Sequence, residues 1–274
     1  MRGPFQALLA LSAAIAFAFL LLPLVALFLR VAPGDLIAGL GSEEVRDALL
    51  VSLKTSAIAH VIILLVGTPV AYLLGTHDFR GRGLLITLVE LPLVLPPAVA
   101  GIGLLAAFGR RGLLGEEFEA LGVSIPFTQT AVVLAIVFVA SPFYVRQAIA
   151  AFASVDRTLL DASRTLGSGP GRTFWRVALP LASSGLVAGS SLAFARGLGE
   201  FGATIIFAGS FPAVTRTAPL AIYAELDRNF DAALALGVLL IVVSVVVLAS
   251  VKALTSWTFF AWTSPSPSAP STSS

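Results

Sequence analysis

Residues 156–180 read DRTLLDASRTLGSGPGRTFWRVALP and form the longest polar interval between two strongly apolar regions of the chain. Within this interval, Leu159, Ala162 and Leu166 recur at positions i, i+3 and i+7, a spacing that predicts one apolar face of a short helix. Gly167 supplies a stop for that helix, and the Ser-Gly-Pro-Gly run that follows it cannot continue a helix.

A second short amphipathic segment is predicted at 173–179, ending at Pro180. A short helix held outside a membrane between two spans has an apolar face to offer to a partner. Alternatively, the same face packs back onto the membrane-spanning helices. The pattern alone leaves both interpretations open.

The composition of the 274-residue chain is that of a membrane protein. Hydrophobic residues make up 57% and charged residues 12%, whereas soluble domains carry about 25% charged residues. The mean hydropathy is +0.97. With no cysteine and two histidines, neither a disulfide nor a metal site built from thiolates or histidines is expected. The net charge of +2 is small, and no nucleic-acid partner is expected.

Apolar runs long enough to cross a bilayer, which takes roughly 20 residues each, predict an all-α membrane protein with six transmembrane helices. The first run lacks a clean small-residue cleavage site, so it is interpreted as a retained span and not as a signal peptide. A Pro/Ser-rich tail at 263–274 is predicted to be disordered. The expected spans, within a single membrane domain at 1–262, are about 5–29, 48–75, 84–108, 128–151, 183–208 and 231–256.

Six spans place both termini on one side of the membrane, and the distribution of Lys and Arg indicates which side. The termini and the loops at 76–83 and 146–182 hold nine Lys or Arg residues, and the opposite loops hold six. Cytoplasmic loops carry an excess of Lys and Arg. Both termini and the interval 152–182 are therefore predicted to be cytoplasmic.

The third predicted span contains a charge and several helix breakers. Glu90 lies inside it, just before Pro92, Pro96 and Pro97. A charge within a span costs on the order of 2.5–3.5 kcal/mol and usually faces a bundle interior or cavity. Prolines delete backbone donors and break the helix. The span therefore either lines a central pathway or contains a buried kink with Glu90 bonded to the freed backbone.

The fifth predicted span combines two charges with many small residues. Arg196 and Glu200 are four residues apart and share one helix face. We expect them to neutralise each other and hold the packing of the span, without forming a substrate site. The order Arg before Glu is less favourable in an isolated helix, so a partner for Glu200 on a neighbouring span is the alternative.

The small residues permit close helix approach, at an interface between two copies, within one subunit, or both. They are Gly185, Gly189, Ser190, Gly197, Gly199 and Gly202.

No reaction chemistry is visible in the sequence. The chain lacks the Gly-x-x-x-x-Gly-Lys loop that cradles phosphates, so it is not itself an ATPase. An intramembrane enzyme would have only scattered candidates, such as His60, Glu90 and Glu200. A stand-alone channel leaves the interval 156–180 unexplained. The sequence therefore favours a transporter subunit.

The interval 156–180 also resembles the cytoplasmic loop motif of permease subunits of bacterial ABC importers. That motif is Glu-Ala-Ala, three residues, Gly, nine residues, and Ile-x-Leu-Pro. Here Asp, Ser and Val replace Glu, the second Ala and Ile, and the spacing matches throughout. The resemblance implies a type I ABC importer permease fold and a loop, 152–182, that docks in a cleft of a separate ATPase subunit. The residues assigned to this coupling are Leu159, Asp161, Ala162, Ser163, Leu166, Gly167, Val177, Leu179 and Pro180.

A second resemblance concerns the substrate. The strings AFARGLGEFGAT (193–204), FAG (207–209), TAPLAIY (217–223) and DAALA (231–235) are similar to those of the molybdate/tungstate permease family. Sulfate/thiosulfate permeases, which show Gly-Glu-Tyr-Gly-Ser in place of the GEFGA string at 199–203, are the alternative.

This resemblance implies a homodimer in the bacterial cytoplasmic (inner) membrane, with two cytoplasmic ATPase subunits and an external oxyanion-binding protein. No cofactor is expected in this chain, because ATP and Mg would bind the ATPase subunit. No metal ligand is expected either. The residues expected to line or shape the membrane pathway are Glu90, Pro92, Pro96, Pro97, Arg196, Gly199, Glu200, Phe201 and Gly202.

Overall fold

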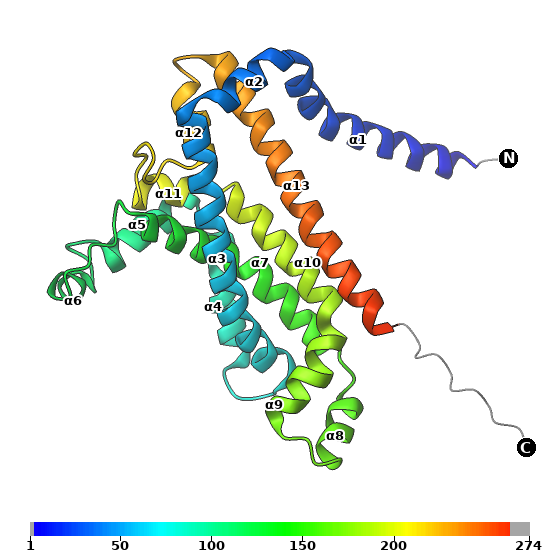
Figure 1. Ribbon diagram of the computed structural model, residues 1–274. Coiled ribbons are helices and arrows are strands. Elements are labelled where there is room, and N and C mark those ends of the chain that lie inside the picture. Colours follow the sequence, from blue (N-terminus) through cyan, green and yellow to red (C-terminus); the bar gives the residue numbers. More distant parts are fainter. Residues whose placement is uncertain (1–2, 264–274) are drawn as a thin grey trace, which may run out of the picture. The chain divides into compact units, whose positions relative to one another are not determined.

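The computed structural model describes residues 3–263, apart from the side chains of 4, 38–40 and 251–263. Every regular element in this part of the chain is a helix, as predicted (Figure 1). The tail predicted at 263–274 lies outside the described residues after 263. The helices are α1 Pro4–Arg30, α2 Pro33–Gly41, α3 Glu43–Thr76, α4 Arg82–Val94, α5 Pro97–Phe108, α6 Gly115–Ala120, α7 Gln129–Ala153, α8 Arg157–Thr165, α9 Pro170–Thr173, the π-helix η1 Phe174–Ala178, α10 Leu179–Leu198, α11 Gly202–Phe207, α12 Ala218–Glu225 and α13 Phe230–Thr263.

Five of the described helical segments are long and apolar enough to cross a membrane. They are α1, α3, α7, the continuous α9–η1–α10 segment and α13. The helices α4 and α5 supply a further candidate as a pair, bent by 115° at a short break. Neither member of that pair reaches the roughly 20 residues that a crossing needs. The described chain thus has five spans, or six when the bent pair counts as one.

The described residues form two compact units. Unit 1 comprises the residues up to Leu53 together with Gly209–Val243, and unit 2 comprises Lys54–Ala208 together with the chain from Ser244. Unit 1 has two small apolar cores, one around Val238 and one around Leu236. The single membrane domain at 1–262 stays a prediction.

The core of unit 2 is built along α7, which packs beside α10 (Figure 1). Glycines of α10 allow the two backbones to approach closely. A Cβ atom at Gly185 would lie 2.5 Å from Cβ of Ala151, and one at Gly189 would lie 2.9 Å from Cβ of Gln147. These small residues therefore serve packing within one chain, which was one of the two interpretations of the fifth span.

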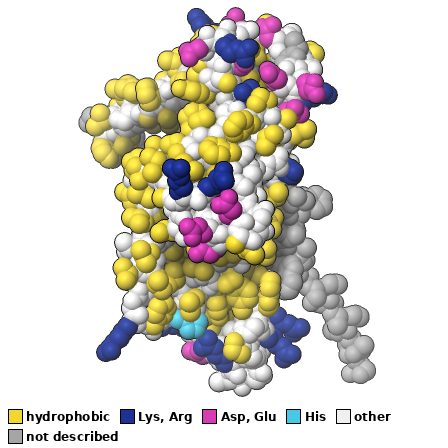
Figure 2. Space-filling model, turned by 90° about the vertical axis from the view of Figure 1, so that its left-hand side faces the viewer, with side chains coloured by type: hydrophobic (Ala, Val, Ile, Leu, Met, Phe, Trp, Pro, Cys, Tyr) yellow, Lys and Arg dark blue, Asp and Glu magenta, His cyan; other side chains and the backbone are white. Residues whose placement is uncertain are grey.

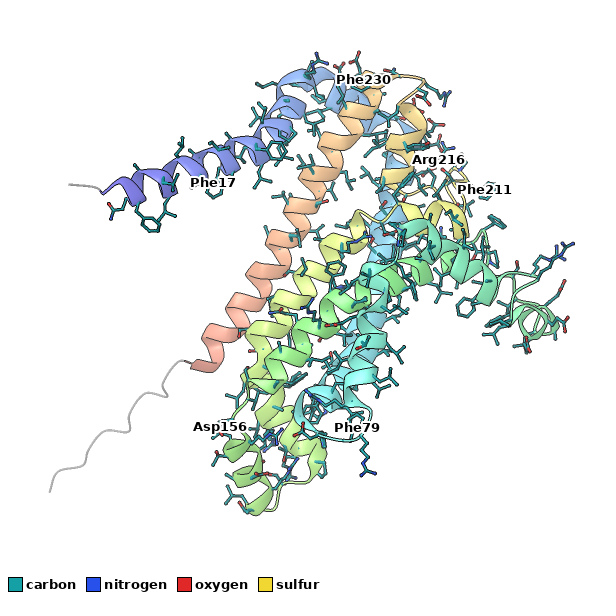
Figure 3. All side chains as sticks on the ribbon, turned by 180° about the vertical axis from the view of Figure 1, so that it is seen from behind. Phe17, Phe79, Asp156, Phe211, Arg216 and Phe230 are labelled. Carbon is teal, nitrogen blue, oxygen red and sulfur yellow. The ribbon has the colours of Figure 1, made fainter. Side chains whose placement is uncertain are left out.

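The two ends of unit 2 are identified by contacts between its connecting segments. At one end, Asp78 pairs with Arg157 at the start of α8, and Figure 3 shows Phe79 and Asp156 at this end. At the other end, α5 packs on α11, and the backbone N–H of Phe127 donates to the carbonyl of Phe207 over 3.3 Å. The pair α4 and α5 starts near the first of these ends and packs on α11 at the other, and its bend of 115° is that of a broken span or of a re-entrant loop.

The break in the third span occurs at Pro96 and Pro97, while Pro92 stays inside α4. The fifth span differs from its prediction, because the structure divides 183–208 into two helices. Here α10 begins earlier, at Leu179, and ends at Leu198, and α11 follows as a separate short helix.

Large apolar side chains cover much of the molecular surface. Figure 2 shows one face on which hydrophobic side chains predominate. The most apolar window of α1 has no buried residue. Exposed apolar helices of this length are what lipid surrounds in a membrane.

Candidate functional site

The helix α8 has a defined start and a defined end. The Asp156 carboxylate accepts hydrogen bonds from the backbone nitrogen of Thr158 at 2.8 Å and from its hydroxyl at 2.6 Å, which caps the helix. At the other end Gly167 has a φ of +81°. Its N–H donates to the carbonyl of Arg164, and the next N–H donates to that of Ser163, the bonding pattern of a Schellman motif. The prediction that Gly167 ends this helix is confirmed.

The segment after the turn is a helix that runs without interruption into the membrane. The π-helix η1 connects α9 to α10, and Pro180 lies in the first turn of α10. The prediction that the amphipathic segment 173–179 ends at Pro180 is therefore wrong. Within this continuous helix Pro180 removes one backbone donor, and the wider turn of η1 lies just before it.

Buried contacts hold α8 against the segment that follows it. The hydroxyls of Ser163 and Thr173 are buried and hydrogen-bonded at 3.1 Å. The ring of Phe174 packs edge-on against Tyr72, with ring centroids 4.9 Å apart, and also contacts Phe152. The loop is therefore fixed to the end of α3 and to α7.

The predicted apolar stripe of α8 faces outward. Leu159 is 48% exposed and Leu166 is 86% exposed, and Ala162 between them is also exposed. Leu160 is buried in their place. The interpretation that the stripe packs back onto the spans is therefore wrong. Trp175 of η1, which the sequence patterns did not single out, adds an apolar side chain that is 67% exposed.

The other predicted coupling residues are placed as follows. Asp161 is exposed and pairs with Arg164 over 3.2 Å. The side chains of Val177, Leu179 and Pro180 are half-buried, so they are less accessible to a partner than Leu159 and Leu166.

An ion pair that sequence reasoning missed ties the α3–α4 loop to α8. Arg157 Nη2 lies 2.8 Å from Asp78 Oδ2, and each side chain is 69% exposed. The hydrogen bond from Arg157 and its charge lower the pKa of Asp78, and the same contact raises the pKa of Arg157.

The caps at this end of α8 give a testable pH dependence. Hydrogen bonds from the hydroxyl and the backbone of Thr158 lower the pKa of Asp156. A carboxyl with a lowered folded pKa stabilises above its unfolded pKa and loses that stabilisation as pH falls through the folded value. Amide hydrogen exchange in α8 is therefore expected to be constant, after correction for intrinsic rates, from about pH 8 to 5 and to rise only below about pH 4.

Asp156→Ala is expected to accelerate exchange in α8 between about pH 5 and 8, where the parent carboxylate is ionised, while Asp156→Asn keeps an oxygen that accepts from Thr158. Exchange in Asp156→Ala that matches the parent protein would show that the cap does not stabilise α8.

In the membrane part of unit 2, the breaks of the third and fifth spans meet. Pro96 precedes α5 as its N-cap and Pro97 is its first residue. Gly199 ends α10, and Phe201 is the N-cap of α11. A Cβ atom at Gly202 would collide with Cβ of Pro97. The two breaks therefore form one tightly packed contact between α5 and α11.

The predicted pair of Arg196 and Glu200 is present in the structure. Arg196 Nη2 lies 2.8 Å from Glu200 Oε2, and the Glu200 side chain is 1% exposed. Glu200 lies after the end of α10, so the two residues do not share one helix as predicted. Its Oε1 accepts a hydrogen bond from the backbone nitrogen of Ala203 at 2.8 Å. Glu200 thereby joins the end of α10 to the start of α11.

A mutational cycle tests this pair. Arg196→Gln leaves the buried Glu200 carboxylate without its counter-charge, at a cost of up to about 3–5 kcal/mol. Adding Glu200→Gln removes that charge and keeps an amide oxygen for Ala203. The double variant is therefore expected to give more folded protein than either single variant, measured as the monodisperse yield after size exclusion. A double variant worse than both would show that each residue acts separately, and Arg196 would become a candidate oxyanion contact.

A second intramembrane ion pair involves Glu90. Its Oε1 lies 3.3 Å from Nε of Arg146, and the side chains are 37% and 70% exposed, respectively. The interpretation that Glu90 is buried and bonded to freed backbone is therefore wrong. Arg146 lies within α7 and not in the loop after it. It therefore no longer counts among the nine Lys or Arg residues assigned to the termini and the loops at 76–83 and 146–182.

Comparison with known proteins places these features in a family. Residues 67–259 match the model of the "binding-protein-dependent transport system inner membrane component" family. The chain is 48% identical over 243 residues to the molybdenum transport system permease protein ModB of Mycobacterium tuberculosis, covering 86% of this chain and 90% of that protein. It is 32% identical over 237 residues to a probable sulfate transport system permease protein of Chlorokybus atmophyticus, covering 85% and 82%.

A solved structure shares the fold. A chain of a bacterial ABC transporter involved in the import of the polysaccharide alginate superimposes with a TM-score of 0.72 and 16% identity, covering 92% of this chain and 95% of that one. The fold is that of a type I ABC importer permease. The chain belongs to the family of inner membrane components of binding-protein-dependent transport systems. It is a multi-pass membrane permease and not an enzyme.

Proposed function

We propose that this chain forms the translocation pathway of an ATP-driven importer for molybdate or tungstate. The observation that carries the proposal is the 48% identity, over most of both chains, to a molybdenum transport permease. Identity to the probable sulfate permease is lower, at 32%, so sulfate/thiosulfate import is the second candidate. The GEFGA string at 199–203, which differs from the sulfate pattern, supports the first.

The proposed partners are a second copy of this chain, cytoplasmic ATPase subunits and an external oxyanion-binding protein. ATP and Mg would be bound by the ATPase subunits. The exposed apolar stripe of Leu159, Ala162 and Leu166 supports docking of an ATPase, because α8 is held at one end of unit 2 by the buried Ser163–Thr173 contact and the stripe stays uncovered in the described chain. Trp175 of η1 is a further exposed apolar side chain of the same loop.

The continuity of the docking loop with the membrane helices supports mechanical coupling. Because η1 runs directly into α10, a movement of the docking loop is carried into that helix. Close glycine contacts pass the movement from α10 to α7, and Glu200 joins α10 to α11. A change in the spacing of two ATPase subunits would thereby reach the break between α10 and α11, and through it α5.

The test is ATP hydrolysis by the complex reconstituted in liposomes with its ATPase subunits and binding protein. Molybdate, tungstate and sulfate are added separately at equal concentration. We expect molybdate or tungstate to stimulate hydrolysis and uptake, and sulfate to do neither. Stimulation by sulfate alone would establish the second candidate and overturn the first.

The proposed orientation places both termini and the docking loop in the cytoplasm. We expect Ser168→Cys to resist an external membrane-impermeant thiol reagent in intact cells, and Ser42→Cys to be labelled. The native chain has no cysteine, so the background is clean. Labelling at position 168 but not at 42 would invert the orientation, and permeabilised cells provide the control that both thiols are reactive.

A further inference from the structure

The ion pair between Glu90 of α4 and Arg146 of α7 lies in an unusual place for two charged side chains. Glu90 is eight residues after the start of α4, about 12 Å along that helix, and Arg146 is seven residues before the end of α7, about 10 Å along it. Both of these helix ends lie at the end of unit 2 that carries α8. The two charges therefore sit at similar depth within the membrane-spanning segments.

Lipid is a poor environment for this pair. The side chain of Arg146 is 70% exposed and that of Glu90 is 37% exposed, and α4 contains no buried residue. Arginine can extend toward the membrane surface, but a glutamate side chain is too short to do so from this depth. Charges inside spans face a bundle interior or a water-filled cavity. In a transport permease, the water-filled surface is the wall of the pathway.

The geometry of the pair leaves most of the guanidinium group available. The contact with Glu90 uses Nε of Arg146, and no further hydrogen bond or ion pair of Arg146 occurs among the side chains that the structure describes. The two terminal nitrogens can donate to adjacent oxygens of a tetrahedral oxyanion. Arg196 differs, because its partner Glu200 is buried and bonded to Ala203.

We propose that Arg146 binds the transported oxyanion at the wall of the pathway. Glu90 competes with the anion for Arg146 and thereby speeds the dissociation of the anion. The inference rests on the proposed function. Conduction requires binding that is weak enough for the ion to leave. An arginine without a nearby carboxylate would retain a divalent oxyanion, whereas Glu90 repels the anion and takes its place on Arg146 after release. Arg146 is thus a substrate contact, and Glu90 is a positioning residue.

The first experiment tests whether water reaches the face of α4 that carries Glu90. Thr87 lies three residues before Glu90 and on the same face, whereas Leu88 is about 200° around the helix from Glu90; both side chains are exposed. In the reconstituted complex, with both membrane sides accessible, a water-soluble methanethiosulfonate reagent is expected to modify Thr87→Cys much faster than Leu88→Cys. An equal or slower rate at position 87 overturns the proposal.

The second experiment measures the site itself. In the Thr87→Cys complex, molybdate is expected to slow modification, and its half-protecting concentration reports the local affinity. Arg146→Gln should raise that concentration by about tenfold or more, because a charge-assisted contact is lost. Glu90→Gln should lower it and should also slow uptake, because the anion leaves more slowly. The combined change should behave like Arg146→Gln.

These opposite shifts separate the proposal from a structural ion pair. A structural pair predicts that both single changes reduce folded yield and that the double change restores it. Parent-like protection in all variants would mean that the pair does not contact the anion. Either result overturns the inference while leaving import by the parent complex intact. If no oxyanion stimulates the parent complex, the proposed function fails, and the inference fails with it.

Discussion

Gly167→Val is expected to leave membrane insertion intact, weaken ATPase binding by about tenfold or more, and uncouple ATP hydrolysis from transport. Gly167 has a φ of +81°, in the left-handed region where a side chain costs about 1–2 kcal/mol and a β-branched one is a genuine outlier. No atom lies within 4 Å of a Cβ placed there. The strain is therefore entirely in the backbone, and it is relieved by reorienting the turn that fixes the exposed face of α8.

Gly169→Val is the matched control for this prediction. Gly169 lies two residues further along the same turn, with a φ of −66° and equally open space around its Cβ position. Valine adopts that conformation without strain. The measurement is the amount of ATPase subunit that co-purifies with each variant, together with oxyanion-stimulated hydrolysis. Normal transport by Gly167→Val would show that the left-handed turn is dispensable.

Gly101→Ala is expected to reduce the stability of the membrane bundle by about 1–3 kcal/mol, the usual cost of overpacking. A Cβ at Gly101 would lie 2.8 Å from Cβ of Ile206 and 3.0 Å from the carbonyl oxygen of Ala203. Both atoms belong to α11, and neither is the flexible end of a side chain. The helices α5 and α11 must therefore separate, which disturbs the contact between the two broken spans.

Gly103→Ala provides the control in the same helix. No atom lies within 4 Å of its Cβ position, so the extra methyl group fits, and alanine favours the helix. Thermal unfolding of the purified complexes is the measurement. We expect a lower midpoint for Gly101→Ala and an unchanged or higher midpoint for Gly103→Ala. Equal midpoints would mean that α5 and α11 are less closely packed than their backbones indicate.

Features of the chain that depend on nearby residues could be predicted from the sequence. Long apolar runs define most of the spans, because a bilayer requires a fixed length of apolar helix. Pro96 and Pro97 break the third span, since they remove backbone donors. Gly167 ends α8, because few other residues adopt its backbone angles. In each case the physical cause lies within a few residues of its effect.

The fifth span shows where local reasoning stops. Its apolar composition predicts one helix across 183–208, yet the structure ends α10 at Leu198. The Glu200 side chain bonds to the backbone at the start of α11 and pairs with Arg196. The sequence shows the charges of Arg196 and Glu200, but it does not show that the backbone leaves the helix between them.

Only the tertiary structure decides which side chains face outward and which distant charges meet. Leu159 and Leu160 are neighbours of identical chemistry, and the position of α8 against the other helices buries the second and exposes the first. Asp78 pairs with Arg157, and Glu90 pairs with Arg146. These pairs form because helices distant in sequence pack together, and the packing depends on the shapes of many side chains at once.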